Sequence, residues 1–500
     1  MTPLKKLARE TAVYGLSSII GRLLNYFLVP LYTRIFLPYE YGIVTELYAY
    51  ASFLMVLLTF GMETTFFRFS ESHIEKGKVY STSIMPVIGV NLVFILLGII
   101  GSSFIADKLH YGHHSEYLIY FVFIIGLDAI TAIPFARLRQ QHRSLKFAMF
   151  RLINIAINVM LNLFFLLLCP YLLKHGFYAI KTIYNPSIGV GYVFMSNMIA
   201  SAFGVLLLSG DIFRFKVEFD RKLFRDMIAY AMPLLLAGMA GMVNETLDRI
   251  LLRYLLVVPA GIADANEYIM AQIGIYGANY KVSILMTLFV QTFRYAAEPF
   301  FFSRAKEDDS RELYAKVMIY FILFGLVIFL GIMLYIDIVK HFIGAKYYPG
   351  IGIVPILLLA NLFLGIIFNL SIWYKLSNMT KYGAYITIFG AVVTIATNFL
   401  LIPFMGYAGA AWATFVCYFL MMILSYIWGQ KHFHVEYNLK KIAGYFLLAL
   451  SIYFVSKIWH FHSQYLLFIM NSILFIAFVG LSFYKENLLR LFSPKSGLEH

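Results

Sequence analysis

The sequence predicts an all-α polytopic membrane protein with 14 transmembrane helices, and three observations support this prediction. Apolar residues make up 61% of the 500 residues and charged residues only 13%, against roughly 25% in a soluble domain. Apolar runs of about 20 residues, the length that an α-helix needs to cross a bilayer, recur along the whole chain. They do not alternate with polar residues as the strands of a membrane barrel do. A soluble fold and a barrel are therefore both excluded.

The expected spans follow one another with short loops between them. They fall at residues 12–36, 41–67, 82–105, 116–136, 145–169, 187–209, 226–256, 268–302, 314–336, 351–375, 381–404, 406–429, 441–459 and 465–484. Prolines are expected inside six of these spans, at Pro30, Pro86, Pro134, Pro233, Pro299 and Pro355. Neighbouring helices or water must then satisfy the carbonyls that a proline frees.

The distribution of basic residues orients the spans. If the N-terminus is cytoplasmic, 27 of the 40 lysines and arginines fall in segments that face the cytoplasm, and seven fall on the opposite side. Cytoplasmic loops of membrane proteins carry such an excess of positive charge. The sequence therefore predicts that both termini are cytoplasmic. Dispersal of these residues over many loops argues against nucleic acid as a partner.

An internal repeat links the two halves of the chain. At an offset of 235 residues, Tyr41-Gly42 falls on Tyr276-Gly277, and the pattern Glu-x-x-Phe-Phe recurs at 63–67 and 298–302. Six spans separate the copies, which is an even number, so both copies insert in the same orientation. Repeats of this kind are related by an axis along the membrane normal and enclose a central site.

Two further matches extend the repeat on both sides. Asn25 and Arg34 fall on Asn244 and Arg253, and an asparagine-led motif recurs at the fifth and eleventh spans. We therefore expect two six-helix lobes related by a pseudo-two-fold axis, and two extra C-terminal helices. The expected boundaries are 1–210 for the N-lobe, 211–430 for the C-lobe, 431–484 for the extra helices, and 485–500 for a cytoplasmic tail that ends in a tag remnant.

Ionisable residues inside the spans are the main candidates for function, because each costs about 2.5–3.5 kcal/mol at a helix centre. They concentrate in the first, second, seventh and eighth spans, which predicts a polar cavity between these spans. The cations are Arg22, Arg34, Arg151, Arg249, Lys281 and Arg294, and the anions are Glu46, Glu63, Asp128, Glu245, Asp248 and Glu298.

Several of these residues have a purely structural alternative. Glu245 with Arg249, and Arg294 with Glu298, stand four residues apart and can neutralise each other on one helix face. Arg34 and Arg151 lie near span ends and can reach the membrane interface. Glu46 and Lys281 occupy equivalent repeat positions with opposite charge, so they either face each other as a gate or pair locally.

Arg22 stands apart, because it lies mid-span beside Asn25 without a carboxylate within four residues on its helix. A substrate or another helix must supply its counter-charge. The residues expected to bind substrate in the central cavity are Arg22, Asn25, Arg249, Lys281 and Arg294. The residues expected to gate the cavity or to couple an ion are Glu46, Glu63, Asp128, Asp248 and Glu298.

No enzymatic chemistry is expected from this chain. It has no G-x-x-x-x-G-K-[ST] phosphate loop for ATP, and its paired histidines lack acidic or cysteine ligands at metal spacing. No loop is long enough for a soluble catalytic domain. We therefore expect neither a metal nor a cofactor, and the membrane potential, protons or sodium ions remain as driving forces.

The sequence resembles the polysaccharide-transporter (Wzx-like) branch of the multidrug/oligosaccharidyl-lipid/polysaccharide exporter superfamily. The resemblance lies in residues 30–42 (PLYTRIFLPYEYG), 230–233 with Asp248-Arg249, Ile275-Tyr276, and 398–411 (NFLLIPFMGYAGAA). It implies a V-shaped fold with alternating access, and a flippase for undecaprenyl-pyrophosphate-linked oligosaccharides such as O-antigen units in the bacterial inner membrane. Membrane lipids and the polymerase or other assembly proteins of a surface polysaccharide are the implied partners.

Three alternatives remain beside this resemblance. Lipid II flippases also place a cavity arginine at the position of Arg22, but they add further arginines where this chain has Leu28 and other neutral residues. Multidrug or metabolite antiporters of the superfamily generally have twelve spans and an acidic cavity without the cations. The third alternative is a membrane component of a polysaccharide-assembly complex that transports nothing itself.

Overall fold

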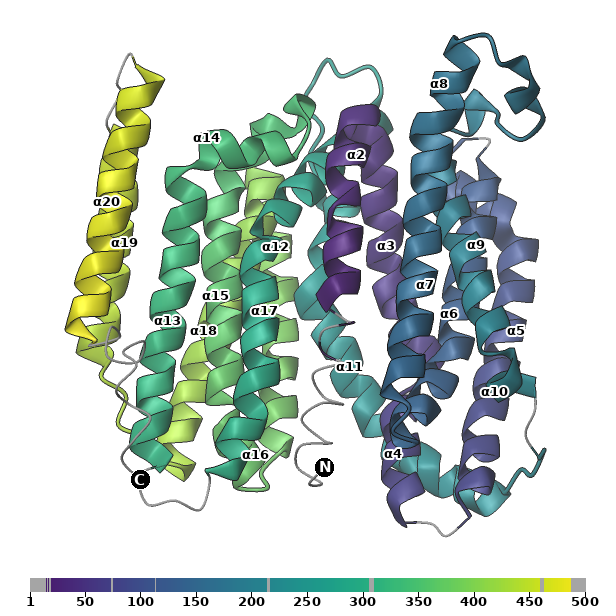
Figure 1. Cartoon of the computed structure of the whole chain (residues 1–500), viewed down its shortest axis with the longest axis horizontal. Coiled ribbons are helices and arrows are strands. Elements are labelled where there is room, and N and C mark those ends of the chain that lie inside the picture. Colours follow the sequence, from purple (N-terminus) through teal and green to yellow (C-terminus); the bar gives the residue numbers. More distant parts are fainter. Residues whose placement is uncertain are drawn as a thin grey trace. The chain divides into compact units, whose positions relative to one another are not determined.

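The computed structural model describes residues 15, 17, 19–72, 75–112, 114–213, 216–304, 310–458 and 463–486. Over these residues the chain is helical, with no strand (Figure 1). The chain divides into two compact units. The first comprises residues 1–278 with 394–410, and the second comprises residues 279–393 with 411–500.

The first unit holds the helices of the N-terminal half. They are α2 (Leu28–Ile35), α3 (Pro38–Thr59), α4 (Met62–Ser72), α5 (Lys76–Lys108), α6 (Ser115–Gln140), α7 (Ser144–Leu163), α8 (Cys169–Lys174), α9 (Gly191–Leu207), α10 (Ser209–Phe213), α11 (Arg221–Leu255) and the start of α12 (Ala265–Ser303). A π-helical turn, Phe164–Leu168, joins α7 to α8, and two 3-10 turns, Tyr178–Thr182 and Pro186–Ile188, precede α9.

The second unit holds the rest of α12 and most of the later helices. They are α13 (Ser310–Leu334), α14 (Ile336–Val339), α15 (Val354–Leu370), α16 (Ile372–Leu376), most of α17 (Lys381–Met405) and α18 (Tyr407–His432), α19 (Leu439–Ile458) and α20 (Gln464–Lys485). Phe321 of α13 stacks on Phe289 of α12 at 5.1 Å between ring centroids, and α13 also contacts α15, α19 and α20. The α19–α20 pair, drawn in yellow in Figure 1, is the predicted C-terminal addition.

Twelve described helices are long and apolar enough to cross a membrane, and each coincides with one of the predicted spans. The predicted span 187–209 corresponds to the shorter apolar helix Gly191–Leu207. The first predicted span lies partly outside the described residues, which include α2 and the helical residues 19–26. The structure therefore confirms a polytopic helical protein without confirming the count of fourteen.

One predicted span is interrupted. The sequence predicts a continuous helix over 41–67, whereas the structure ends α3 at Thr59 and starts α4 at Met62. Phe60 and Gly61 both adopt left-handed backbone, with φ of 36° and 70°. A side chain at Gly61 would place its Cβ 3.1 Å from the carbonyl oxygen of Ala231 in α11. Close packing on α11 thus accounts for the glycine at the break.

Local sequence signals explain where two important helices begin. Pro38 occupies the first turn of α3, where its missing N–H costs nothing, and Glu40 accepts a hydrogen bond from the Leu37 amide at 2.7 Å. Asp220 caps α11 by accepting hydrogen bonds from the amides of Lys222 and Leu223. The pKa of the Asp220 carboxyl is held below its ordinary value, mainly by the hydrogen bond from the Leu223 amide and next by the hydrogen bond from Lys78.

Pro355 lies inside the span Ala345–Leu376, as predicted, at the first turn of α15, which follows the 3-10 helix Ala345–Ile353. Pro86, Pro134 and Pro233 also lie inside α5, α6 and α11. The predicted division into lobes 1–210 and 211–430 stays a prediction. In the structure, α11 and the start of α12 group with the N-terminal helices because they pack against α3, as described below.

Candidate functional site

Buried charge is concentrated in one part of the first unit. Five charged residues are buried among those that the structure describes: Glu46, Asp211, Asp248, Arg249 and Arg253. Four of these lie on α3 and α11, and only Asp211 lies elsewhere, on α10. Buried charges are costly unless they are paired, so the partners of these four residues define the candidate site.

Glu46 and Arg253 form the centre of the site. Glu46 of α3 is fully buried, and its Oε2 atom lies 2.6 Å from Nη1 of Arg253 on α11. The hydroxyl of Tyr111, in the loop after α5, donates to the same Oε2 at 2.7 Å. Arg253 also donates to the carbonyl of Leu109 and, at 3.3 Å, to Oδ1 of Asn266 at the start of α12. This network, called here the Glu46–Arg253 network, joins α3, α11, α12 and the α5–α6 loop.

Beside the network, α3 and α12 cross with their backbones in contact. A Cβ at Gly42 would lie 2.0 Å from the carbonyl oxygen of Met270, and one at Gly274 would lie 1.9 Å from that of Pro38. A Cβ at Gly277 would lie 2.4 Å from Oγ1 of Thr45. Only glycine permits such an approach. Gly42 and Gly277 are the two copies of the Tyr-Gly repeat motif, so the repeat places a glycine on each side of one helix crossing.

A second cluster lies on α11, one to two turns from Arg253. The hydroxyl of Tyr276 donates to Oδ2 of Asp248, and Nη1 of Arg249 lies 3.4 Å from Oδ1 of the same carboxylate. Arg249 also donates to the backbone carbonyl of Glu245 at 2.6 Å. The structural alternative for Glu245 and Arg249, a bridge between them, is not formed: the Glu245 side chain is exposed, and Arg249 lies against Asp248.

Arg294 and Glu298, in the second unit, do form the bridge that their spacing predicts. Nε of Arg294 lies 3.1 Å from Oε1 of Glu298, and Lys375 of α16 pairs with the same oxygen. The Arg294 guanidinium also lies 4.7 Å from the ring centroid of Phe368. These contacts favour the structural alternative for Arg294 and Glu298. Lys281 is half-buried in the same unit.

The remaining acidic candidates are paired within the first unit. Glu63 of α4 binds Arg139 of α6. Asp128 of α6 accepts a hydrogen bond from Ser201 of α9 and attracts Arg151 of α7 electrostatically. Each pair joins neighbouring helices. Within the first unit, Glu46 of α3 pairs with Arg253 of α11. The gate between Glu46 and Lys281 stays a prediction.

Arg22 and Asn25 have exposed side chains, so protein does not bury Arg22 as the sequence led us to expect. Oδ1 of Asn25 faces Nδ2 of Asn158 on α7 at 3.5 Å, a long contact for a hydrogen bond. Arg34 is also exposed at the end of α2, as expected for a residue that reaches an interface.

Sequence reasoning missed three members of the Glu46–Arg253 network: Arg253, Tyr111 and Asn266. Arg253 lies within the predicted span 226–256 and matches Arg34 in the repeat. These two signals could have identified it as a buried cation. Tyr111 and Asn266 lie in or beside loops, and no sequence pattern distinguishes them there. The described residues contain no group of histidine, cysteine and acidic residues that could hold a metal ion.

Residues 7–303, more than half of the chain, match the family described as polysaccharide biosynthesis protein. No curated protein sequence matches the chain. Among solved structures it is similar to the lipid II flippase MurJ in an inward-closed conformation. The identity is 15% and the TM-score 0.67, and the alignment covers 95% of this chain and 99% of that one.

The chain is also similar to a multidrug resistance MATE family transporter of the MOP superfamily in two conformations. The inward-facing form aligns with 12% identity and a TM-score of 0.62 over 84% of this chain and 94% of that one. The outward-facing form aligns with 13% identity and a TM-score of 0.56, over 86% of this chain and 96% of that one. These structures are of a flippase and of transporters, not of enzymes. With residues 7–303 matched, the chain belongs to the polysaccharide biosynthesis protein family, and it shares the fold of these solved structures.

Proposed function

We propose that the chain is a flippase that moves undecaprenyl-pyrophosphate-linked oligosaccharide from the cytoplasmic to the periplasmic leaflet of a bacterial inner membrane by alternating access. The observation that carries this proposal is the closed contact of α3 with α11 and α12. In the predicted lobes, α3 belongs to the N-lobe and the other two helices to the C-lobe. Alternating access requires such a contact at one end of the molecule, made in one state and broken in the other.

The predicted topology places this contact at the outer end. On that topology α3 begins, and α5 and α11 end, on the periplasmic side. Glu46, Arg253 and Tyr111 all lie near those helix ends. On this proposal the contact closes the periplasmic end, and substrate enters from the cytoplasmic side.

The substrate head group suits the exposed cation of the first span. Arg22 offers a planar fork of donors, which matches phosphate oxygens in pairs. A mid-span arginine that protein does not bury faces either lipid or an aqueous cavity, and the cavity costs less. The membrane potential favours outward movement of an anion by about 2.3 kcal/mol per charge per 100 mV. Proton or sodium coupling through Glu46, Glu63, Asp128, Asp248 or Glu298 would add to this force.

Vesicles that contain the purified protein test the function directly. We expect Arg22→Ala to slow the flipping of a pyrophosphate-linked sugar at least about tenfold, because charge-assisted hydrogen bonds contribute about 1.5–3 kcal/mol each. Arg22→Lys should retain part of the rate. The control is Arg34→Ala, which removes an exposed arginine from the same segment and should flip normally.

Wild-type flipping by a well-folded Arg22→Ala protein would contradict the role of Arg22. Transport of lipid II in preference to the oligosaccharide lipid, or of a cationic drug driven by an ion gradient, would favour the two transporter alternatives. The absence of transport of all three would favour a structural role in polysaccharide assembly.

Cysteine labelling tests the proposed orientation. Tyr178, before α9, and Lys216, before α11, are both exposed and fall on opposite sides in the predicted topology. A membrane-impermeant maleimide added to intact cells should label Tyr178→Cys and leave Lys216→Cys unlabelled until the cells are opened. The native Cys169 and Cys417 are buried and give little background. Labelling of both positions in intact cells would refute the orientation.

A further inference from the structure

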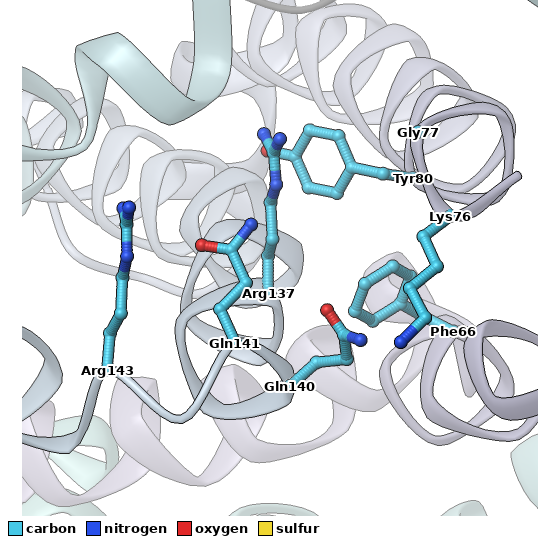
Figure 2. A pocket seen from close by; sticks show the side chains of 8 residues that line it. All are labelled: Phe66, Lys76, Gly77, Tyr80, Arg137, Gln140, Gln141 and Arg143. Atoms are coloured by element: carbon cyan, nitrogen blue, oxygen red, sulfur yellow. The ribbon is translucent and has the colours of Figure 1, made fainter.

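A cavity of about 460 Å³ lies within the first unit, among α4, α5 and the turn from α6 to α7 (Figure 2). Its size falls in the range of about 300–1,000 Å³ that is usual for small-molecule sites. It is lined by Phe66, Lys76, Gly77, Tyr80, Arg137, Gln140, Gln141 and Arg143. In the view of Figure 2, Arg137 lies between Lys76 and Arg143. The lining thus combines three cations with two carboxamides and no carboxylate.

The positive charge of this cavity is not neutralised by the described part of the protein. The cations just outside it do have partners: Lys78 pairs with Asp220 at 3.2 Å, Lys146 pairs with Asp211 at 3.0 Å, and Arg139 pairs with Glu63. These three carboxylates are therefore occupied by other residues. Lys76, Arg137 and Arg143 form no ion pair with a described carboxylate, which leaves the cavity suited to an anion.

Arg137 is held in place before any ligand binds. Its guanidinium carbon lies 4.1 Å from the centroid of the Tyr80 ring. Tyr80 is 1% exposed, and its hydroxyl donates to the backbone carbonyl of Asp211 at 2.6 Å. A stacked guanidinium on a fixed ring loses little conformational freedom on binding. Its donors match the oxygens of a phosphate.

The start of α5 adds to this preference. Lys76 and Gly77 are the first residues of a 33-residue helix, whose N-terminal amides and dipole favour negative charge. The preceding Glu75 makes no side-chain cap to these amides. A Cβ on Gly77 would meet no atom within 4 Å, so the helix start is open on this side.

We propose that this cavity binds a phosphate-bearing anion, supplied either by the head group of an anionic phospholipid or by a soluble phosphate compound. The lining residues lie where the apolar spans of α5 and α6 give way to polar loops, which is the depth of lipid head groups. The topology proposed above places the site on the cytoplasmic side, where basic pockets between helices bind such head groups. The binding itself does not depend on the proposed transport function.

The test measures binding by the purified full-length protein in two arms. The first arm titrates inorganic phosphate and follows thermal unfolding in detergent. The second compares retention of phosphatidylglycerol with that of zwitterionic phosphatidylcholine by native mass spectrometry. Arg137→Gln/Arg143→Gln removes two cavity cations. The matched control, Arg221→Gln/Lys222→Gln, removes two exposed cations from the start of α11, on the same predicted side.

We expect the wild-type protein to bind either inorganic phosphate or phosphatidylglycerol, and the one that it binds identifies the source of the phosphate. The cavity double variant should bind at least tenfold more weakly, and the control within twofold of wild type. If the double variant does not fold, Arg143→Gln alone serves, since Arg143 is exposed. The proposal is overturned if the wild-type protein binds neither probe, or if the control variant loses as much affinity as the cavity variant. Because flipping is not measured, failure here leaves the proposed transport function unaffected.

Discussion

Arg253→Ala is expected to destabilise the folded protein by about 3–5 kcal/mol, the usual effect of removing one partner from a buried ion pair. Glu46 is fully buried, and Arg253 is the cation that neutralises it. Without the guanidinium, the Tyr111 hydroxyl is the one donor to the carboxylate that would remain among the described residues. The contacts that Arg253 makes with Leu109 and Asn266 would be lost at the same time. The melting temperature of the protein in detergent measures the effect.

Two further variants separate loss of the pair from a general effect of losing an arginine. Arg34→Ala removes the exposed residue that matches Arg253 in the repeat, and it should leave the melting temperature nearly unchanged. Glu46→Gln combined with Arg253→Ala removes the buried charge, so this double variant should be more stable than Arg253→Ala alone. Wild-type melting of Arg253→Ala would show that the Glu46–Arg253 network does not hold α3 to α11.

Gly274→Ala is expected to abolish transport by preventing the crossing of α3 and α12. The added Cβ would lie 1.9 Å from the carbonyl oxygen of Pro38, which is backbone and cannot turn away. Overpacking of this kind usually costs about 1–3 kcal/mol. We therefore expect α3 and α12 to move apart at the crossing, so that the end of the molecule at the Glu46–Arg253 network stays open.

Cysteine reactivity checks this outcome alongside flipping. Thr45 lies against Gly277 at the crossing, so Thr45→Cys should react faster with a water-soluble maleimide when Gly274 is alanine. Gly89→Ala in α5 is the matched control, because its Cβ would meet no atom within 4 Å and alanine favours a helix. Normal flipping and an equally protected Thr45→Cys in the Gly274→Ala protein would disprove the proposed closure.

The sequence predicted the helices well because long apolar runs leave the chain little choice in a bilayer. The spacing of Arg294 and Glu298 allowed the bridge that they form. The same spacing of Glu245 and Arg249 gave no bridge, because Arg249 lies against Asp248 instead. The partner of Glu46 could not be predicted in this way, because Arg253 lies 207 residues along the chain and no periodic pattern joins them. The Tyr111 contact depends on the course of a loop, which local sequence does not determine.

The crossing of α3 and α12 was predicted in part. The repeat identified Tyr41-Gly42 and Tyr276-Gly277 as equivalent positions. It did not show that Gly42 and Gly277 would lie at one crossing, although equivalent positions near a two-fold axis approach each other. The break at Phe60 and Gly61 was not predicted, because a single glycine in a long apolar run does not by itself end a helix. Both residues adopt left-handed backbone, and Gly61 packs closely on α11.

The break between α3 and α4 offers a hinge, about which α3 could tilt as one rigid helix. At 1.5 Å per residue, the 22 residues of α3 extend about 33 Å from the break to Pro38. A tilt of about 10° around Phe60 and Gly61 would then displace the far end by roughly 6 Å, which is comparable to one turn of a helix. Glu46 lies about 14 residues from the break, so the same tilt displaces it by roughly 4 Å, enough to part its carboxylate from Arg253. In such a tilt α4 would keep its contacts with α5 and α6, whereas the contacts of α3 with α5, α6 and α11 are the ones that opening would change.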